Sequence, residues 1–361
     1  MPRNLMSDTP PATLRDIADA AGVSVAAASK VLNNRGGVSE ENRQRVLAAA
    51  DQLGYQGRSA RAIQRAGVGA ATIIMPAAYY SDSLFYEDIV KGVLEECAAS
   101  GLSVEVRLVA PITEGGQAEI ESILADPASG AIIAIGLDDA VLIDRIAAAE
   151  TPAVLINGMD RSMRIDSVLP DNWSAGWLAT QRLLAAGHRQ IMHVTLPHRL
   201  TMRRRLDGFR VALTEAGLGF DPDRHVLDLG QMGFAETQTR NAIIAAHQQG
   251  RLEGVTAFFC SSDMVAFGLM QGLQSLGFAV PDDFSVIGLD DVALAGNSRP
   301  PLTTMRIERA ELGRSGASLL LGRITNPGRS AIRMNMGVEL IERATVAPPR
   351  GNPGLRSGRA Q

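Results

Sequence analysis

Many of the polar, charged and aromatic side chains that could bind a ligand follow short apolar runs that are typical of β-strands. In open α/β sheets, ligands bind beyond the carboxyl ends of the strands. An arginine fork and a carboxylate can each address two adjacent hydroxyl groups, so the set predicts a site for a small polyhydroxylated or heterocyclic molecule. Its members are Tyr79, Tyr80, Ser83, Phe85, Asn157, Arg199, Thr201, Arg205, Ser261, Ser262, Asp263, Asp290 and Asp291.

Binding is a better interpretation of these residues than catalysis. The sequence has no motif that pairs a nucleophile with a base, and no glycine-rich phosphate loop precedes a helix. His188, His193 and His198 are spaced by five, which matches neither a helix face nor a strand face, so we do not expect metal ligands. We expect no catalytic residue, cofactor or metal. An enzyme acting on a sugar or nucleoside, with Asp263, Asp290 or Asp291 as acid or base, remains the alternative.

Apolar runs and amphipathic stretches alternate from Ala70 onward. This alternation predicts parallel sheets with helices on both faces, and about 275 residues are too many for one such sheet, so we expect two doubly wound α/β lobes. The predicted strands are Ala71–Met75, Ser103–Leu108, Ala131–Ile135, Ala153–Ile156, Gln190–Thr195, Ala257–Cys260, Ser285–Gly288 and Val338–Arg343. The predicted helices are Tyr86–Ser100, Asp171–Ala186, Arg205–Ala216, Phe234–Gln249, Met264–Leu276 and Glu308–Arg323.

Residues 14–32 have a different pattern, that of two short helices joined by a tight turn. Gly22 is suited to the left-handed conformation that ends a helix, and Ser24 is a good N-cap for the second one. A third helix should start after Ser39, with Arg43, Val46, Ala50 and Leu53 in register. Together these features predict an all-α helix-turn-helix headpiece, whose second helix can enter the DNA major groove. An ordinary helical hairpin is the alternative.

The charge distribution agrees with DNA contact at one end of the chain. Residues 1–66 carry nine Arg and Lys against six Asp and Glu, whereas the remainder carries 26 against 33. The first residues contain no apolar signal segment, and no apolar run reaches the roughly 18 residues of a membrane span. Cys97 and Cys260 lie in separate apolar runs and are expected to be reduced. We therefore expect a cytoplasmic protein associated with the nucleoid.

The chain resembles the lac repressor family over residues 13 to about 346. In the headpiece the resemblance rests on Thr13-Leu14-x-Asp16-Ile17-Ala18, Ala21-Gly22-Val23-Ser24 and Ser29-Lys30-Val31-Leu32-Asn33. In the body it rests on Phe85-Tyr86-x-x-Ile89-x-x-Gly92, Gly187-His188-Arg189, Arg205-x-x-Gly208-Phe209 and Val286-x-Gly288-x-Asp290-Asp291. The family body is similar to periplasmic sugar-binding proteins.

The composition and the resemblance together predict a domain order. It comprises a disordered arm over 1–12, the headpiece over 13–55, a hinge linker over 56–68, a two-lobed effector and dimerisation domain over 69–346, and a disordered tail over 347–361. The hinge lacks the proline and asparagine of the family pattern, and Ile63 is the candidate to wedge into the minor groove; a flexible linker without base contacts is the alternative. Tail residues offer no leucine heptads, so no tetramerising coiled coil is expected there.

The resemblance also implies the binding residues. For DNA they are Thr13, Leu14, Ser24, Val25, Ala26, Ser29, Lys30, Asn33, Ser39, Asn42, Tyr55 and Ile63. For the effector they are Phe85, Asn157, Arg199, Thr201, Arg205, Phe234, Ser262 and Asp290. Asn157 and Ser262 depart from the Asp and Asn of many members. We hypothesise that Val25 and Ala26 meet thymine methyl groups, and that Lys30 carries the main polar readout.

The function implied is a homodimeric repressor of carbohydrate metabolism genes. It would bind a pseudo-palindromic operator under the control of a sugar, or of a sugar derivative, held between the lobes. A purine- or nucleoside-responsive regulator of the same architecture is the first alternative. A sugar-binding receptor without DNA function is the second, and the headpiece argues against it.

Overall fold

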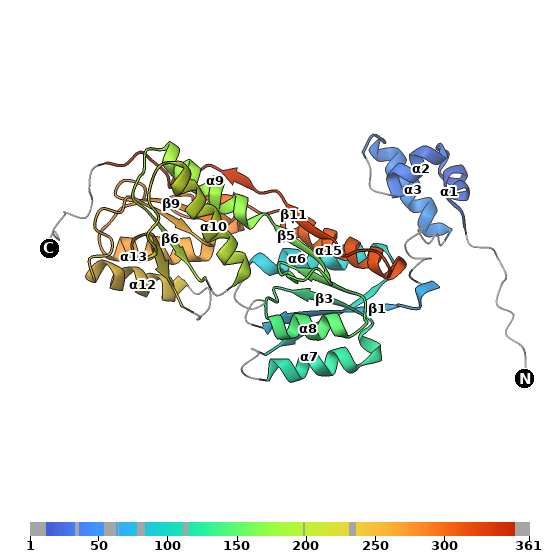
Figure 1. Ribbon diagram of the computed structural model, residues 1–361. Coiled ribbons are helices and arrows are strands. Elements are labelled where there is room, and N and C mark those ends of the chain that lie inside the picture. Colours follow the sequence, from blue (N-terminus) through green and yellow to red (C-terminus); the bar gives the residue numbers. More distant parts are fainter. Residues whose placement is uncertain are drawn as a thin grey trace, which may run out of the picture.

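The computed structural model describes residues 12–32, 36–53, 63, 65–77, 84–110, 115–197, 199–230 and 236–350. They form a three-helix headpiece and two α/β lobes (Figure 1). Three residues predicted to bind DNA or effector, Asn33, Tyr55 and Phe234, lie outside the described residues, as do Tyr79, Tyr80, Ser83 and His198. None of the described helices is long and apolar enough to cross a membrane.

The headpiece consists of α1 (Leu14–Ala21), α2 (Val25–Leu32) and α3 (Glu40–Gln52). Gly22 ends α1 with a φ of 62°, and the backbone N–H of Ala27 donates to Ser24 Oγ at 3.1 Å, so both predicted turn signals are confirmed. The buried core is Ile17, Ala18, Ala21, Ala28, Val31, Val46 and Ala49. Of the residues predicted in register on the third helix, Val46 is buried and Ala50 packs against the core, whereas Leu53 follows the end of α3 and is 42% exposed.

The first lobe is a six-stranded sheet in the order β11-β5-β4-β3-β1-β2. Its pairings are all parallel, which agrees with helices covering both faces. In Figure 1, α6 and α15 lie on one side of this sheet, and α7 and α8 lie on the other. The strands are β1 (Ala70–Pro76), β2 (Ser103–Val109), β3 (Ala131–Ile135), β4 (Ala153–Ile156), β5 (Asp166–Pro170) and β11 (Arg333–Met336); the helices are α6 (Leu84–Ala99), α7 (Gly116–Ala125), α8 (Ala140–Ala148) and α15 (Arg309–Thr325), with a 3-10 turn at Pro127–Ser129.

The second lobe repeats this design with the order β12-β10-β9-β8-β6-β7, where only β12 is antiparallel. Phe258 and Val286 of its sheet belong to the same buried cluster as Ile243 and Leu269 of two covering helices. The strands are β6 (Ile191–Thr195), β7 (Val226–Asp228), β8 (Ala257–Cys260), β9 (Ser285–Asp290), β10 (Thr303–Arg306) and β12 (Glu339–Ile341); the helices are α9 (Asn172–Ala185), α10 (Leu200–Glu215), α11 (Pro222–His225), α12 (Glu236–Gln248), α13 (Asp263–Ser275) and α14 (Ala293–Asn297).

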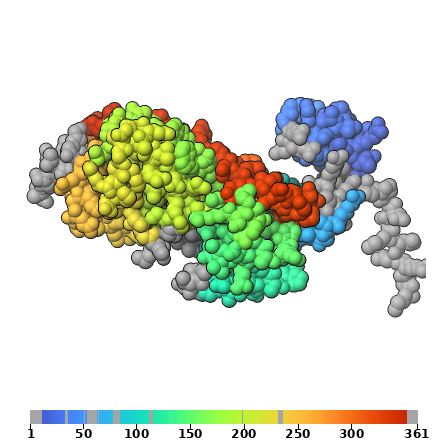
Figure 2. All heavy atoms as spheres, in the orientation of Figure 1, coloured from blue at the N-terminus to red at the C-terminus, as the bar shows by residue number. Residues whose placement is uncertain are grey.

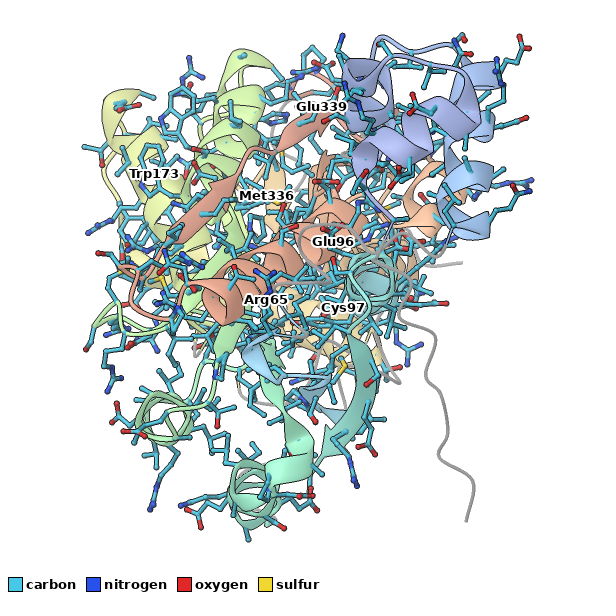
Figure 3. All side chains as sticks on the ribbon, turned by 90° about the vertical axis from the view of Figure 1, so that its right-hand side faces the viewer. Arg65, Glu96, Cys97, Trp173, Met336 and Glu339 are labelled. Carbon is cyan, nitrogen blue, oxygen red and sulfur yellow. The ribbon has the colours of Figure 1, made fainter. Side chains whose placement is uncertain are left out.

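The chain passes between the lobes at three places in the described residues. These are β5 to α9, β10 to α15, and β11 to β12. Met336 and Glu339 mark the third passage on one continuous ribbon in Figure 3. Figure 2 shows the two lobes in broad contact, with α15 running along one edge of the first lobe. Three short connections leave the lobes able to move as two bodies about a hinge.

Both lobes have helix crossings that require glycine. A Cβ on Gly176 of α9 would lie 2.0 Å from the carbonyl oxygen of Arg205, and one on Gly208 of α10 would lie 2.1 Å from that of Trp173. The first lobe has the same arrangement in Gly92 of α6 and Gly313 of α15. These close approaches fix the position of α10, which carries Arg205.

The prediction of two parallel α/β lobes is confirmed, although several elements were missed. The strands β5, β7, β10 and β11 and the helices α7, α8, α11 and α14 were not predicted. Residues beyond the predicted domain boundary at 346 also contact the second lobe. Ala347 N donates to Ser285 Oγ at 3.0 Å, and Arg350 forms an ion pair with Asp282 at 2.7 Å.

Candidate effector cleft and DNA-binding surface

A small cavity of about 30 Å³ lies between the lobes, at the carboxyl ends of their strands. Its described lining comprises Phe85, Tyr86, Asn157, Arg199, Met202, Arg205, Ser262, Met264 and Asp290. Six of the eight predicted effector residues are therefore brought together there. Of the other two, Thr201 is buried but not in the lining, and Phe234 is outside the described residues. In this arrangement of the lobes the cavity has room for little more than water.

Arg205 and Asp290 form the polar centre of the cavity. Arg205 Nη2 lies 4.0 Å from Asp290 Oδ1, and Arg205 Nε donates to Asn172 Oδ1 at 2.8 Å. A second guanidinium nitrogen donates to the Ser261 carbonyl. Burial lowers the pKa of Arg205 and raises the pKa of Asp290 to about 8, against the attraction between the two groups. Asp290 also has a φ of 129°, so its backbone is strained at the site.

The neighbouring aspartates are occupied by structural interactions. Asp263 accepts hydrogen bonds from Thr304 Oγ1 at 2.6 Å and from Val292 N at 3.0 Å, and burial raises its pKa to about 6. Burial also acts to raise the pKa of Asp291, but hydrogen bonds from Arg343 and Arg306 lower it overall. Neither carboxylate lines the interlobe cavity, which disfavours the alternative in which they act as acid or base.

Arg199 of the second lobe is bound mainly by groups of the first lobe. Its Nε donates to Asp138 Oδ2 at 3.1 Å, and its Nη1 donates to the Tyr86 hydroxyl at 3.0 Å. Nη2 donates to the carbonyl of Gly136 at 3.2 Å and lies 3.5 Å from that of Asn157. The side chain is only 4% exposed. Arg199 therefore connects the two lobes as well as lining the cavity.

Asn157 retains hydrogen-bonding capacity toward a ligand. Its Nδ2 donates to the Tyr86 hydroxyl at 3.1 Å, while its buried Oδ1 has no partner among the described residues. The φ of Asn157 is 54°, a conformation that asparagine tolerates better than most residues. Ser262 instead uses its hydroxyl to cap α13, accepting from Val265 N at 3.2 Å. An unpartnered buried oxygen at a ligand cavity is a natural acceptor for a ligand hydroxyl.

Sequence reasoning missed three lining residues, Tyr86, Met202 and Met264. Tyr86 packs edge-on against Phe85, with ring centroids 5.0 Å apart. Met202 precedes Arg205 by three residues on α10, so helical spacing places both on one face. That spacing was a usable signal for Met202. Metal ligation was not expected, and the described residues contain no group of three or more His, Cys, Asp or Glu that could hold a metal ion.

The second helix of the headpiece presents a small, partly apolar face. Ser24, Val25, Ala26 and Lys30 are exposed, with Val25 at 43%, whereas Ala28 and Val31 are buried and Ser29 is half-buried. The remaining predicted contacts include two helix caps: Thr13 forms a capping box with Asp16, and Ser39 Oγ accepts from Asn42 N at 3.4 Å. Leu14 and Asn42 are half-buried. Their contacts with DNA stay predictions.

Ile63 differs from the expectation of an exposed wedge. It is only 2% exposed and belongs to the large buried cluster around β1, α6 and α15. A side chain in this position cannot reach a base step. The wedge role stays a prediction, and it requires Ile63 to leave the cluster when the protein binds DNA.

The chain is similar to known regulators along nearly its whole length. Residues 13–57 match the model of bacterial regulatory proteins of the lacI family, and residues 180–346 match that of periplasmic binding protein-like domains. The HTH-type transcriptional repressor PurR of Vibrio atlanticus is 30% identical over 342 residues, which cover 93% of this chain and 98% of the relative. The ribose operon repressor of Haemophilus influenzae is 28% identical over 326 residues, covering 88% and 94%.

Solved structures give the same result. A transcriptional regulator CelR–cellobiose complex is 26% identical with a TM-score of 0.69, and the match covers 93% of this chain and 100% of that one. The lac repressor dimer bound to operator and the anti-inducer ONPF is 26% identical with a TM-score of 0.67, covering 93% and 99%. These relatives are transcription regulators, not enzymes. The chain belongs to the lacI family of bacterial regulatory proteins, and it is a DNA-binding regulator with an effector-binding domain.

Proposed function

We propose that this protein is a repressor whose affinity for operator DNA is set by a neutral carbohydrate bound between the lobes. The observation that carries this proposal is the convergence of Arg205, Asp290 and Asn157 on one interlobe cavity. A guanidinium, a carboxylate and an amide oxygen are the groups that bind adjacent sugar hydroxyls. Phe85 adds an aromatic face, which suits the apolar face of a sugar ring.

The mechanism follows from the placement of the site across two bodies. The second lobe supplies Arg205 and Asp290 and the first lobe supplies Asn157 and Phe85, so a ligand bound to both sets changes the relative free energy of open and closed lobes. In a homodimer, this change alters the relative position of the two headpieces and hence their fit to a pseudo-palindromic operator. A coupling of about 1–3 kcal/mol is typical for such a pair of sites.

A purine or nucleoside is the second candidate effector. Two points favour it: PurR repressors are among the relatives at 30% identity, and the resemblance to the family implies that Arg199 and Thr201 match contacts of purine-type members. Against it, Arg199 is already bound to Asp138, Tyr86 and two backbone carbonyls of the first lobe. Either ligand requires the lobes to separate from this arrangement, because the cavity holds only about 30 Å³. A purine bound through Arg199 would in addition have to replace the contacts that this side chain makes with the first lobe.

Fluorescence anisotropy on operator DNA tests the proposal. The operator is first obtained by binding-site selection with the full chain, and binding is then titrated with neutral sugars, purine bases and nucleosides. We expect a sugar to change the operator Kd at least fivefold. Asp290→Asn should abolish this response, and Arg210→Ala, at an exposed position on α10, should retain it. A response to purines alone, or a response that survives Asp290→Asn, contradicts the carbohydrate proposal.

A further inference from the structure

A cavity of about 340 Å³ lies in the second lobe, at the end of its sheet opposite the effector site. Residues 189–190, directly before β6, and residues 218–221 and 224–225, before β7, line it. The cavity therefore borders the amino ends of these parallel strands, whereas Arg199 and Arg205 follow the carboxyl end of β6. None of its described lining residues lines the interlobe cavity. We call it the distal cavity.

Two arginines in the wall of the distal cavity have no carboxylate partner among the described residues. Arg189 Nη1 donates to the carbonyl oxygens of Leu184 at 3.1 Å and of His188 at 3.0 Å. Arg224 Nη2 donates to Gln190 Oε1 at 3.4 Å. These acceptors are uncharged, so they orient the two guanidinium groups without neutralising their charges. Since a guanidinium has five N–H donors, both arginines retain donors for a further acceptor.

The carboxylate in the described lining, that of Asp221, has a structural role. Asp221 Oδ1 accepts from Asp223 N at 3.0 Å and so caps α11. The described lining thus carries two guanidinium charges against one carboxylate charge, and is positive overall. Phe220 completes the wall. It stacks on His225 with ring centroids 5.9 Å apart and packs edge-on against the buried Phe209 at 6.3 Å, so the core fixes its position.

The chemistry of this wall favours a phosphate group as the ligand. The planar fork of arginine matches both carboxylate and phosphate. A phosphate has three acceptor oxygens and a charge of nearly −2 at neutral pH, so it can accept from two guanidinium groups at once. A carboxylate has two oxygens and a single charge. The cavity volume of about 340 Å³ is near the lower limit for small-molecule sites, so it fits a compact phosphorylated molecule.

We propose that the distal cavity binds a small phosphorylated molecule, with Arg189 and Arg224 donating to its phosphate oxygens. Phe220 flanks the rest of the ligand. The site lies in one lobe and outside the cleft, so this inference does not rest on the carbohydrate proposed there. Helix α10 connects the two sites, because it starts directly after Arg199 and ends at Glu215, shortly before the wall of the distal cavity.

Calorimetric titration of the full chain, saturated with an operator duplex obtained by selection, tests this site. Bound operator occupies the phosphate-binding surface of the headpiece, so anion binding that remains lies elsewhere. The probes are glycerol phosphate, adenosine monophosphate and inorganic phosphate, compared with glycerol, adenosine and succinate. We expect at least one phosphorylated probe to bind with a Kd below about 1 mM, roughly tenfold or more tighter than succinate and than its counterpart without phosphate.

Two arginine variants of the second lobe locate the binding. Arg224→Glu, at an exposed position of the cavity wall, replaces a donor with a carboxylate and should weaken the bound probe at least about tenfold. Arg210→Ala removes an exposed arginine of α10 outside the cavity lining and should leave the affinity unchanged. Urea denaturation checks that Arg224→Glu is folded as stably as Arg210→Ala.

The outcomes separate this inference from the proposed function. The distal site is wrong if no phosphorylated probe binds to the operator complex, if succinate binds equally well, or if folded Arg224→Glu and Arg210→Ala have the same affinity. The response of operator binding to neutral sugars, and its loss in Asp290→Asn, is measured separately. Phosphate binding that persists without any sugar response would contradict the proposed function alone.

Discussion

Arg309 of the first lobe forms a hydrogen bond with Asp290 of the second lobe, a residue that lines the interlobe cavity. Arg309, the first residue of α15 in the first lobe, donates from Nη1 to the carbonyl oxygen of Asp290 in the second lobe at 2.5 Å. Its Nη2 pairs with Asp88 of α6 at 2.9 Å. The backbone of Asp290 is strained, so an ionised donor at its carbonyl stabilises the conformation that aims its carboxylate at Arg205.

Arg309→Ala should therefore weaken both the fold and the response to effector. The variant removes charge-assisted hydrogen bonds from a side chain only 13% exposed, so we expect a loss of about 2 kcal/mol in the free energy of unfolding. Urea denaturation measures it. Arg314→Ala is the control on the same helix, because Arg314 makes only exposed ion pairs and should cost less than about 1 kcal/mol. Equal losses would show that Arg309 has no special role.

The raised pKa of Asp290 predicts a pH dependence of stability. The pKa of an aspartate in the unfolded chain is about 3.9, whereas burial raises the pKa of Asp290 in the folded protein to about 8. The folded state therefore binds more protons between these values, and its stability decreases as the pH rises through this window. Asp290→Asn should reduce that slope by up to about 1.4 kcal/mol per pH unit. Urea denaturation at several pH values measures the free energy of unfolding of the unaltered protein and of Asp290→Asn. The same dependence on pH in both would contradict the prediction.

Val25 should read thymine through its exposed methyl groups. It is 43% exposed at the start of α2, and apolar side chains of this size contact the thymine methyl in the major groove. Binding-site selection with Val25→Ser should relax a thymine preference at one position of each half-site, worth about 1 kcal/mol. Leu47→Ser, at an exposed position on α3, should leave the selected sequence unchanged. A strong guanine preference opposite Val25 in the unaltered protein would contradict the hypothesis.

Gly208→Ala should destabilise the second lobe. The added Cβ would lie 2.1 Å from the Trp173 carbonyl oxygen and 2.7 Å from the Trp177 amide nitrogen, so α9 and α10 must separate. We expect a loss of about 3 kcal/mol, an overpacking cost that exceeds the gain of about 1 kcal/mol in helix propensity. In the control variant Gly219→Ala, the new methyl group has no atom within 4 Å, so the free energy of unfolding should change little. Urea denaturation of both variants checks the difference.

The sequence determined the features that depend on neighbours along the chain. Gly22, Ser24 and Thr13 act through hydrogen bonds to residues within five positions, so the turn and the caps of the headpiece were predictable. Asn157, Arg205 and Asp290 were likewise predictable at the cleft, because each follows an apolar run that forms a strand. Strand β5 was missed because its first residue, Asp166, is a fully buried carboxylate, neutralised by Arg323 and Arg329 from more than 150 residues away.

Only the tertiary structure decided which groups meet across the lobes. Arg199 finds Asp138 and Tyr86, and Ile63 enters the core of the first lobe, through contacts between segments that no local pattern relates. The physical reason is that caps and turns depend on interactions within one helix or turn, whereas a ligand site between two bodies depends on how their surfaces pack.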